Sequence, residues 1–364
     1  MGFRCGIVGL PNVGKSTIFN ALTAAGIESA NYPFCTIEPN VGMVPVPDER
    51  LDRLAKLVKT RSKVHAQMEF VDIAGLVSGA SKGEGLGNQF LGHIRQVDAI
   101  AHVVRCFSDD NIVHVSGSID PTRDREVINT ELILADLDTV QKRLTKTASQ
   151  AKSGDKVYKE QLGILQTIET HLNNGKPARL LTLDDTGRKL LKELFLLSAK
   201  PLLYVANVHE NDILTGNVMV EELEKAAAEE HASVVMISGA IEEELSGLNP
   251  EERLEFLKDM GLAEPGLNRL IKAGYDLLGL ITYFTVGEKE TRAWTLAKGS
   301  KAPQAAGVIH TDFERGFIRA EVIAYGDYIA CGSEATAREK GLLRSEGKEY
   351  VVQDGDCITF RFNV

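Results

Sequence analysis

Cysteine is scarce in this sequence, and its spacing follows no recognisable pattern. The five cysteines are an odd number, they are widely scattered, and no two of them form a Cys-x-x-Cys pair. Cysteine zinc sites and disulfide frameworks usually show recognisable cysteine spacings. The sequence therefore suggests neither kind of site and favours a reducing compartment, so we expect a cytoplasmic protein.

The chain also lacks an excess of positive charge. It contains 41 Lys and Arg against 51 Asp and Glu, a formal net charge of −10. Nucleic-acid binding through overall charge is thereby excluded, because affinity for a phosphate backbone comes from Lys and Arg. Any contact with RNA requires a local basic patch.

Long hydrophobic runs are absent as well. Charged residues interrupt every apolar stretch well before about 18 residues, so we expect no membrane span. A strand-like segment, Phe3–Val8, begins almost at once, and we expect no signal peptide ahead of it. With 364 residues, 43% of them hydrophobic and 25% charged, the chain has a globular composition and the length of two or three domains.

The first motif present is a phosphate loop. Gly9–Ser16 matches the pattern G-x-x-x-x-G-K-[ST] at every fixed position, after an apolar strand and before a helical run. Glycines let the backbone wrap a phosphate, and the N–H groups at a helix N-terminus supply partial positive charge. We predict that Lys15 reaches the β and γ phosphates of a nucleotide and that the Ser16 hydroxyl ligates Mg²⁺.

Two further segments are typical of nucleotide-dependent switches rather than of kinases or motor ATPases. Glu69–Gly75 reads as an apolar strand ending in D-x-x-G. We predict that Asp72 holds Mg²⁺ through water and that the Gly75 N–H senses the γ-phosphate. A turn-rich segment upstream contains Thr36, which we predict completes the Mg²⁺ coordination when the γ-phosphate is present.

A base-reading segment is expected at the end of a later strand. Pro201–Asn207 reads as a buried strand, and Asn207-Val208-His209-Glu210 stands at its carboxyl end, where switch GTPases have N-K-x-D. Two of the four positions therefore differ. A further strand ends in Ser238-Gly239-Ala240, the usual element beside the base. The candidates for nucleotide binding at this end are Asn207, Val208, Glu210, Ser238 and Gly239.

Strand and helix patterns alternate from Gly2 to about Met260, which predicts a doubly wound, mostly parallel α/β sheet. Two helical runs separated by a break at Ser149–Asp155 predict an inserted antiparallel helical hairpin. From Ile281 the pattern changes to alternating strands with one helix over Ala302–Ile309, which predicts a small α+β domain. The predicted domains are residues 1–128 with 198–278 (phosphate-loop domain), 129–197 (inserted helical domain) and 279–364 (C-terminal domain).

The predicted hairpin carries a group of basic residues with few acids between them. A solvated helix face is the simpler interpretation of this group, and a surface facing RNA or the ribosome is the alternative. Its members are Lys142, Arg143, Lys146, Lys152, Lys156 and Lys159.

With these motifs in place, the chain resembles the YchF-type subfamily of Obg-like ATPases over essentially its whole length. The resemblance rests on Gly9–Thr17, Asn207–Glu210, the helical insertion and the C-terminal unit, which is similar to a TGS domain of β-grasp fold through Gly307–Phe313. It implies ATP hydrolysis, Mg²⁺ as cofactor and association with ribosomes. We expect the ribosome, RNA or both as partners, and a monomer. The family pattern further implies that phosphates are held by Asn12, Val13, Gly14, Lys15, Ser16 and Thr17, the metal by Ser16 and Thr36, and the base in part by Asn207 and Val208.

The hydrolytic group is not obvious. Leu76 follows D-x-x-G, where many switch GTPases have the glutamine that orients the attacking water, so we expect slow intrinsic hydrolysis. His114 lies in a loop after the strand Ala99–Val104 and would have to swing toward the γ-phosphate; an incidental loop histidine is the alternative. K⁺ is a second candidate, because Asn12 stands where potassium-stimulated relatives coordinate this ion, although Asn12 otherwise serves only to shape the loop.

We predict ATP rather than GTP as the preferred nucleotide. Val208 removes the Lys whose alkyl chain lies along guanine, and Glu210 extends the Asp position by one methylene, which misplaces its carboxylate by roughly one bond length. The Asn207 amide can donate to adenine N7 and accept from the 6-amino group, whereas guanine presents the acceptor O6 there. A GTPase that tolerates Glu210 is the alternative.

The predicted function is a regulatory ATPase that acts on or beside the ribosome, with Lys15, Asp72, Gly75 and His114 as its catalytic group. Three alternatives remain open on the sequence. They are a GTP-hydrolysing translation factor that binds RNA or the ribosome, a small-molecule kinase, and a non-hydrolysing, nucleotide-gated RNA-binding scaffold.

Overall fold

The computed structural model describes residues 3–29, 40–74, 86–109 and 111–363. These residues form two compact units. Unit 1 comprises Phe3–Gly42 and Glu69–Leu270, and unit 2 comprises Met43–Met68 and Ile271–Val364. None of the described helices combines the length and the hydrophobicity needed to cross a lipid bilayer.

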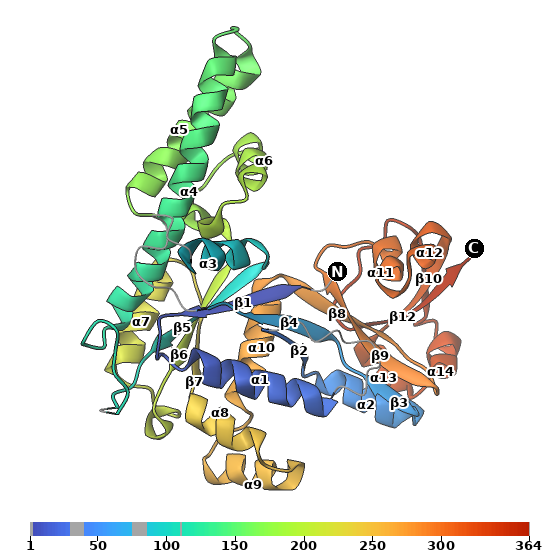
Figure 1. The fold of residues 1–364 in the computed structure, drawn as a ribbon. Helices are drawn as coiled ribbons and strands as arrows, with labels where there is room; N and C mark the ends of the chain where they lie inside the picture. Colours follow the sequence, from blue (N-terminus) through green and yellow to red (C-terminus); the bar gives the residue numbers. More distant parts are fainter. Residues whose placement is uncertain (1–2, 30–39, 75–85, 110, 364) are drawn as a thin grey trace. The chain divides into compact units, whose positions relative to one another are not determined.

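The centre of unit 1 is a six-stranded sheet in the order β2-β4-β1-β5-β6-β7 (Figure 1). The pairs β1–β4, β1–β5, β5–β6 and β6–β7 are all parallel. Every residue of β5 and β6 is buried, as expected where helices cover both faces of a parallel sheet. The strands are β1 (Arg4–Gly9), β2 (Val41–Pro45), β4 (Gln67–Asp72), β5 (Ala99–Arg105), β6 (Leu202–Asn207) and β7 (Val234–Ile237).

Helices lie on both sides of this sheet. Figure 1 shows α1 (Lys15–Ser29) and α8 (Gly239–Ser246) below it and α3 (Leu86–Arg95) above it. The predicted doubly wound α/β fold is thereby confirmed. The other α-helices between β6 and residue 280 are α7 (Val218–Glu229), α9 (Pro250–Asp259) and α10 (Gly266–Leu277).

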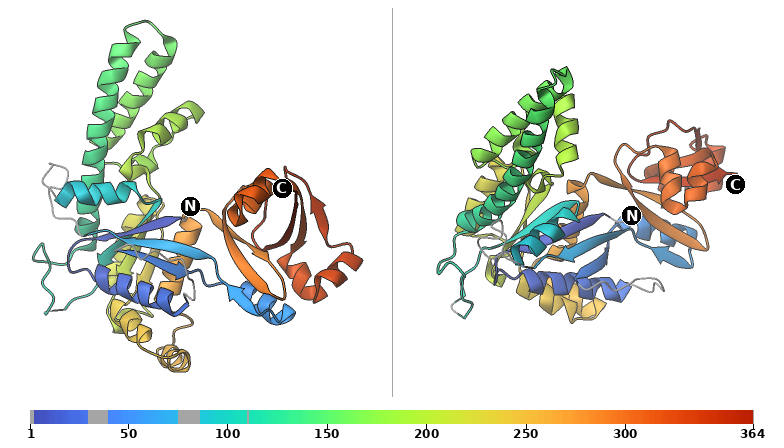
Figure 2. Two further views of the ribbon diagram at one scale, coloured as in Figure 1. Left: turned by 45° about the vertical axis from the view of Figure 1, so that its right-hand side comes forward. Right: turned by 45° about the horizontal axis from the view of Figure 1, so that its top comes forward.

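A helical hairpin is inserted between β5 and β6, as predicted (Figure 2). Its arms, α4 (Pro121–Ala151) and α5 (Lys156–Asn173), bury a shared apolar cluster. Gly154 supplies the left-handed backbone of the turn, with φ of 86°. The chain then returns to the sheet through η2 (Ala178–Leu180), α6 (Asp185–Leu194) and η3 (Leu197–Ala199).

The Glu230 carboxylate, whose side chain is only 10% exposed, links the base of the hairpin to the sheet. Glu230, at the end of α7, accepts hydrogen bonds from Arg125 and Asn129 of α4 at 3.1 and 3.2 Å. It also accepts from Arg179 at 2.5 Å and from the Tyr204 hydroxyl of β6 at 3.0 Å. Burial and the neighbouring Glu230 charge raise the pKa of Tyr204 to about 12. Because a buried charge is costly unless fully paired, this network holds the first turns of α4 in one place.

Unit 2 contains a second six-stranded sheet, in the order β11-β10-β12-β8-β9-β3. The helix predicted over Ala302–Ile309 is present as α11, and its alanines pack into a core with Tyr283 and Phe360. The predicted C-terminal α+β unit is thereby confirmed. Its strands are β3 (Ser62–Val64), β8 (Leu280–Thr285), β9 (Glu290–Ala297), β10 (Phe317–Ala324), β11 (Arg344–Glu346) and β12 (Asp356–Phe362), and its other helices are α2 (Glu49–Val58), α12 (Thr311–Arg315), α13 (Tyr325–Cys331) and α14 (Glu334–Glu339).

One segment is grouped differently from the sequence analysis. Met43–Met68 belongs to unit 2, although it lies within the range 1–128 predicted for the phosphate-loop domain. Its strand β3 pairs in parallel with β9, with Ser62 opposite Glu290. A three-residue strand gives almost no periodic signal, and its partner is far away in the sequence. The predicted three-domain division remains a prediction.

Candidate functional site

The loop between β1 and α1 contains two residues with left-handed backbone. Asn12 has φ of 63° and Gly14 has φ of 89°. Asparagine tolerates this region, but Gly14 is required for a second reason, because a Cβ there would lie 2.1 Å from Asn207 Nδ2. The helix α1 begins at Lys15, and the N–H groups of its first turn have no partner within the helix. Loop and helix together therefore form an anion-binding terminus.

Lys15 and Asp72 form an ion pair at the head of the sheet. Lys15 Nζ donates to Asp72 Oδ1, and the Lys15 side chain is only 10% exposed. Asp72 is the last residue of β4, directly beside β1 in the sheet. The sequence predicted both residues, but the contact between them comes from the strand order.

Asn207 joins the phosphate loop to the last two strands. Its Nδ2 donates to Val13 O and its Oδ1 accepts from Gly239 N, both at 2.9 Å. A carbonyl on one side and an N–H on the other determine the orientation of the amide. Each amide atom keeps one further hydrogen-bonding position, so Asn207 is a structural link that can still contact a ligand.

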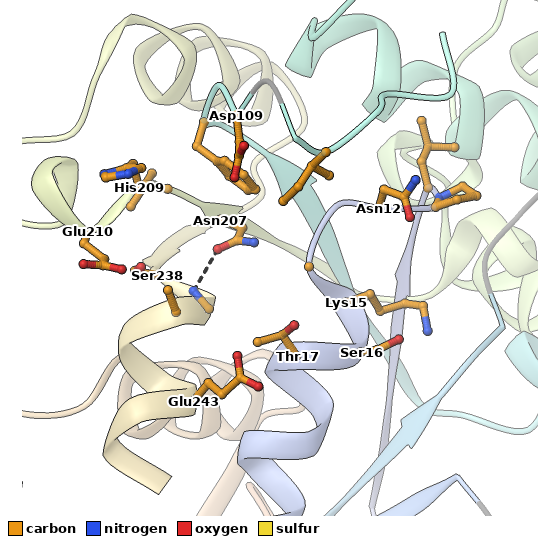
Figure 3. Close-up of a pocket in the computed structure, with 18 residues that line it drawn as sticks. Asn12, Lys15, Ser16, Thr17, Asp109, Asn207, His209, Glu210, Ser238 and Glu243 are labelled. Atoms are coloured by element: carbon orange, nitrogen blue, oxygen red, sulfur yellow. Dashed lines mark hydrogen bonds between the residues drawn. The ribbon is translucent and has the colours of Figure 1, made fainter. Parts of the chain in front are cut away.

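These elements enclose a cavity of about 730 Å³, a size typical of small-molecule sites. Figure 3 shows Asn12, Lys15 and Ser16 at one end, His209 and Glu210 at the other, and Asn207 between them. Of the predicted nucleotide-binding residues, all but Val13 line the cavity: Asn12, Gly14, Lys15, Ser16, Thr17, Asn207, Val208, Glu210, Ser238 and Gly239.

Ser238 is notable at the base end. The residue is 1% exposed, and its Oγ has no hydrogen-bond partner within the described part of the chain. A buried hydroxyl without a partner is costly. Since Ser238 lines the cavity, a bound ligand is one way to satisfy it.

Four lining residues were missed by the sequence analysis: Phe107, Asp109, Ile112 and Glu243. Three of them lie just after β5 and are held there by Arg105, which is fully buried. Its guanidinium donates to the carbonyls of Phe107, Asp109 and Ile112 at 3.0 to 3.2 Å and lies 4.6 Å from the Phe107 ring centre. The sequence signal for these three residues was Arg105 at the end of a buried strand, because a buried guanidinium must find hydrogen-bond acceptors nearby.

His114 does not line the cavity. Its imidazole is buried, and Nε2 lies 2.8 Å from Asp124 Oδ2, within ion-pair distance although not aligned as a hydrogen bond. The predicted swing toward a γ-phosphate would have to break this contact. A catalytic role for His114 remains a prediction.

Thr36, Gly75 and Leu76 lie outside the described residues, and their roles remain predictions. Ser16 lines the cavity from the first turn of α1, and Asp72, at the end of β4, contacts the neighbouring Lys15. A hydroxyl and a carboxylate are the hard oxygen donors that Mg²⁺ requires, with phosphate oxygens and water completing its octahedron. The donor set therefore fits this ion.

Two protein families match parts of the chain. Residues 4–154 match the family described as "50S ribosome-binding GTPase". Residues 280–363 match the YchF-GTPase C-terminal family, described as "Protein of unknown function (DUF933)". In the sequence, the strands β6 and β7 of the first sheet lie between the two matched ranges.

Curated relatives match over the full length. Proteins named "Ribosome-binding ATPase YchF" from Bacillus subtilis and Haemophilus influenzae are each 58% identical, and one from Escherichia coli O157:H7 is 56% identical; every alignment covers 100% of both chains. A solved structure named "Structure of the Schizosaccharomyces pombe YchF GTPase" superposes with a TM-score of 0.91 at 40% identity, covering 99% of this chain and 98% of the other. With its phosphate loop, inserted hairpin and C-terminal unit all matched, the chain belongs to the YchF family of phosphate-loop nucleoside triphosphatases.

Proposed function

We propose that this chain is a ribosome-binding ATPase that hydrolyses ATP, in preference to GTP, to ADP and phosphate. The observation that carries the proposal is a single cavity with a phosphate loop at one end and Asn207–Glu210 at the other. The curated relatives named above as ribosome-binding ATPases support the same conclusion.

The phosphate end binds through backbone and helix as much as through side chains. The N–H groups of the loop and of the first turn of α1 face the β and γ phosphates, and Lys15 exchanges Asp72 for a phosphate oxygen. That exchange frees the Asp72 carboxylate to hold Mg²⁺ through water, while the hydroxyl of Ser16 would ligate the ion directly. The ion, when bound, neutralises charge that develops on the β–γ bridging oxygen.

Hydrolysis joins a water oxygen to the γ-phosphorus and breaks its bond to the β–γ bridging oxygen. Lys15 stabilises the charge on the oxygens of the phosphoryl group being transferred. The water must be oriented by another group, for which His114 and the predicted K⁺ are our candidates. Asn12 Nδ2 donates to Val113 O at 3.1 Å, which leaves Asn12 Oδ1 as the atom that would coordinate K⁺.

The base end favours adenine for a reason that depends on Asn207. Its amide is held by Val13 O and Gly239 N, so exchanging the positions of Oδ1 and Nδ2, in order to place an N–H opposite guanine O6, would cost both hydrogen bonds. Val208 is buried and supplies no cation or long alkyl chain. Glu210 is exposed at the rim of the cavity, one methylene too long for the paired hydrogen bonds that a guanine-reading Asp makes.

Two measurements test the proposal. Calorimetric titration with ATP and GTP in Mg²⁺ should give a several-fold lower Kd for ATP, and ATP turnover should rise when ribosomes are added. Tighter binding of GTP would instead support the GTPase named in the fission-yeast structure and in the phosphate-loop family. Nucleotide binding without any turnover would leave only a non-hydrolysing scaffold.

The hairpin is the surface that we assign to the ribosome. Lys142 pairs with Asp138 and is 76% exposed, and Arg143 is 35% exposed and lies 3.6 Å from Glu193. Reversal of Lys142, Arg143 and Lys146 to Glu should weaken co-sedimentation with ribosomes. Reversal of Lys225 and Lys258, exposed lysines elsewhere in unit 1, is the matched control. Equal binding by both variants would remove the hairpin from the interface.

A further inference from the structure

The contact between His114 and Asp124 joins the segment that carries the proposed catalytic histidine to the helix α4 of the hairpin. His114 belongs to the segment between β5 and α4, and Asp124 belongs to the first turn of α4. The two side chains are only 4% and 2% exposed, and Nε2 and Oδ2 are 2.8 Å apart. Such burial indicates a built contact rather than a chance surface pair.

In this arrangement the imidazole cannot act on a water. Its Nδ1 accepts a hydrogen bond from Ser116 N at 3.2 Å, so a neutral ring carries its proton on Nε2, which faces the Asp124 carboxylate. The ring therefore has no free lone pair with which to accept a proton or to orient a nucleophile. His114 must leave Asp124 before it can serve the γ-phosphate.

The backbone just before His114 is nevertheless hydrogen-bonded to the phosphate loop. The carbonyl of Val113, its immediate neighbour, accepts from Asn12 Nδ2 at 3.1 Å. The preceding carbonyl, of Ile112, is held by Arg105 at 3.0 Å. The segment that carries His114 is therefore tethered beside the phosphate loop on its N-terminal side.

Asp124 is well placed to be moved from a distance. It lies near the start of α4, a continuous helix of 31 residues, which extends about 46 Å at 1.5 Å per residue. Arg125 and Asn129 pin the helix to Glu230 just beyond Asp124, and the rest of α4 forms the hairpin. Asp124 lies about 7 Å before Asn129 along the helix and about 33 Å of helix follows Asn129, so the pinned turns can act as a pivot with a short and a long arm.

Asp124 would not be left unpaired by release of His114. Its Oδ1 accepts from Arg123 Nε and Nη2 at 3.2 and 2.9 Å. The carboxylate therefore keeps a charged partner when the imidazole departs, which lowers the cost of separation. The contact between His114 and Asp124 can therefore form in the free protein and still be broken when a partner binds.

We infer that Asp124 is a positioning residue that withholds His114 from the γ-phosphate until a partner bound to the hairpin tilts α4 and releases it. The inference rests on the proposed function and adds its regulation. Hydrolysis would then be slow in the free protein and faster on the ribosome, without any new catalytic group from the partner.

Asp124→Ala tests the inference directly. Basal ATP turnover should rise at least threefold, and the further stimulation by ribosomes should shrink by a similar factor. The gain should vanish in the double variant Asp124→Ala with His114→Ala, which a merely structural role of Asp124 would not require. Asp138→Ala, an exposed carboxylate on the same helix, should leave basal turnover unchanged. Unchanged or lower turnover in a folded Asp124→Ala protein, or a gain that survives loss of His114, overturns the inference.

Hydrogen exchange provides a readout that does not need activity. The amides of Ser116 and Gly117 are bonded to His114, and they should exchange faster in Asp124→Ala than in the wild type, as they should in the wild type on ribosomes. Exchange that is the same in all three samples contradicts the release of His114. A wild-type protein that hydrolyses no ATP would instead refute the proposed function, and the exchange data would still decide whether Asp124 holds the segment.

Discussion

The two ends of the cavity are made of different parts of the chain. At the phosphate end, the contacts come from backbone N–H groups, a helix terminus and one lysine, shaped by the left-handed residues Asn12 and Gly14. At the base end, they come from side chains, Val208, Glu210 and Ser238 among them. Asn207 is hydrogen-bonded to both ends.

This difference explains why one end follows a general pattern and the other departs from it. Backbone contacts depend on glycine positions and helix geometry, which tolerate few alternatives. Side-chain contacts to a base can be replaced one by one, each with an effect of about 1–3 kcal/mol on the choice of ligand. The phosphate end therefore identifies a nucleoside triphosphatase, and the base end decides which nucleotide it takes.

The largest effect is expected at the phosphate end, from Lys15→Ala. Loss of the ammonium group removes stabilisation of the transferred phosphoryl and leaves Asp72 without its partner. Turnover should fall by about 100-fold or more, the usual cost of one transition-state donor, as measured by phosphate release at saturating ATP. Lys225→Ala, at an exposed position in unit 1, is the control. Turnover within twofold of the wild type would argue against a role for Lys15 in the reaction.

Gly14→Ala should disturb Asn207, the residue that links the two ends of the cavity. The new Cβ would have to accept φ of 89° and would lie 2.1 Å from Asn207 Nδ2. Gly154→Ala is a matched control, because Gly154 has φ of 86° and no heavy atom within 4 Å of the added Cβ. The backbone term alone costs about 1–2 kcal/mol. Denaturant unfolding should show a larger loss for Gly14→Ala, together with weaker ATP binding. Equal losses of unfolding free energy in the two variants would mean that Asn207 moves away from the new Cβ without destabilising the protein.

The base end should respond by a change of preference rather than a loss of binding. The double change Val208→Lys with Glu210→Asp restores the guanine-reading residues and should move the ratio of the two Kd values toward GTP by about tenfold, equivalent to about 1.4 kcal/mol. Titration of both nucleotides measures it. Glu244→Asp, which shortens an exposed carboxylate outside the cavity on α8, should leave the ratio unchanged. No shift in the double variant would place the discrimination elsewhere in the cavity.

The smallest effect concerns the cation proposed at Asn12. ATP turnover in KCl should exceed turnover in NaCl at equal ionic strength by a few-fold, and Asn12→Ala should abolish the difference. Asn12→Ala also removes the hydrogen bond to Val113 O. The nucleotide Kd is therefore measured in parallel, to separate loss of the K⁺ ligand from distortion of the phosphate loop. Equal rates in both salts would refute a K⁺ site.

Much of the fold was predictable because its signals are local. The loop Gly9–Ser16 depends on residues a few positions apart, and the helical spacing of apolar residues in α4 and α5 predicts the hairpin. The strand β3 was not predictable, because three residues carry too short a pattern. Its place beside β9 arises from pairing across a long stretch of chain.

The candidate site divides in the same way. Lys15, Ser16, Asp72 and Asn207 were identified from motifs, whereas Phe107 and Glu243 have no motif around them. The segment after β5 owes its position to a buried arginine that must find acceptors, and that consequence appears only once β5 is known to be fully covered.

The sequence alone determined that this chain has a phosphate loop, a switch-type aspartate, an altered base motif, an inserted hairpin and a separate C-terminal unit. These features follow from backbone preference and periodicity over short stretches. Only the tertiary structure decided that Asp72 meets Lys15, that Asn207 links the two ends of the cavity, and that His114 is paired with Asp124. Those contacts depend on strand order and helix placement, which the burial of apolar surface selects for the whole chain at once.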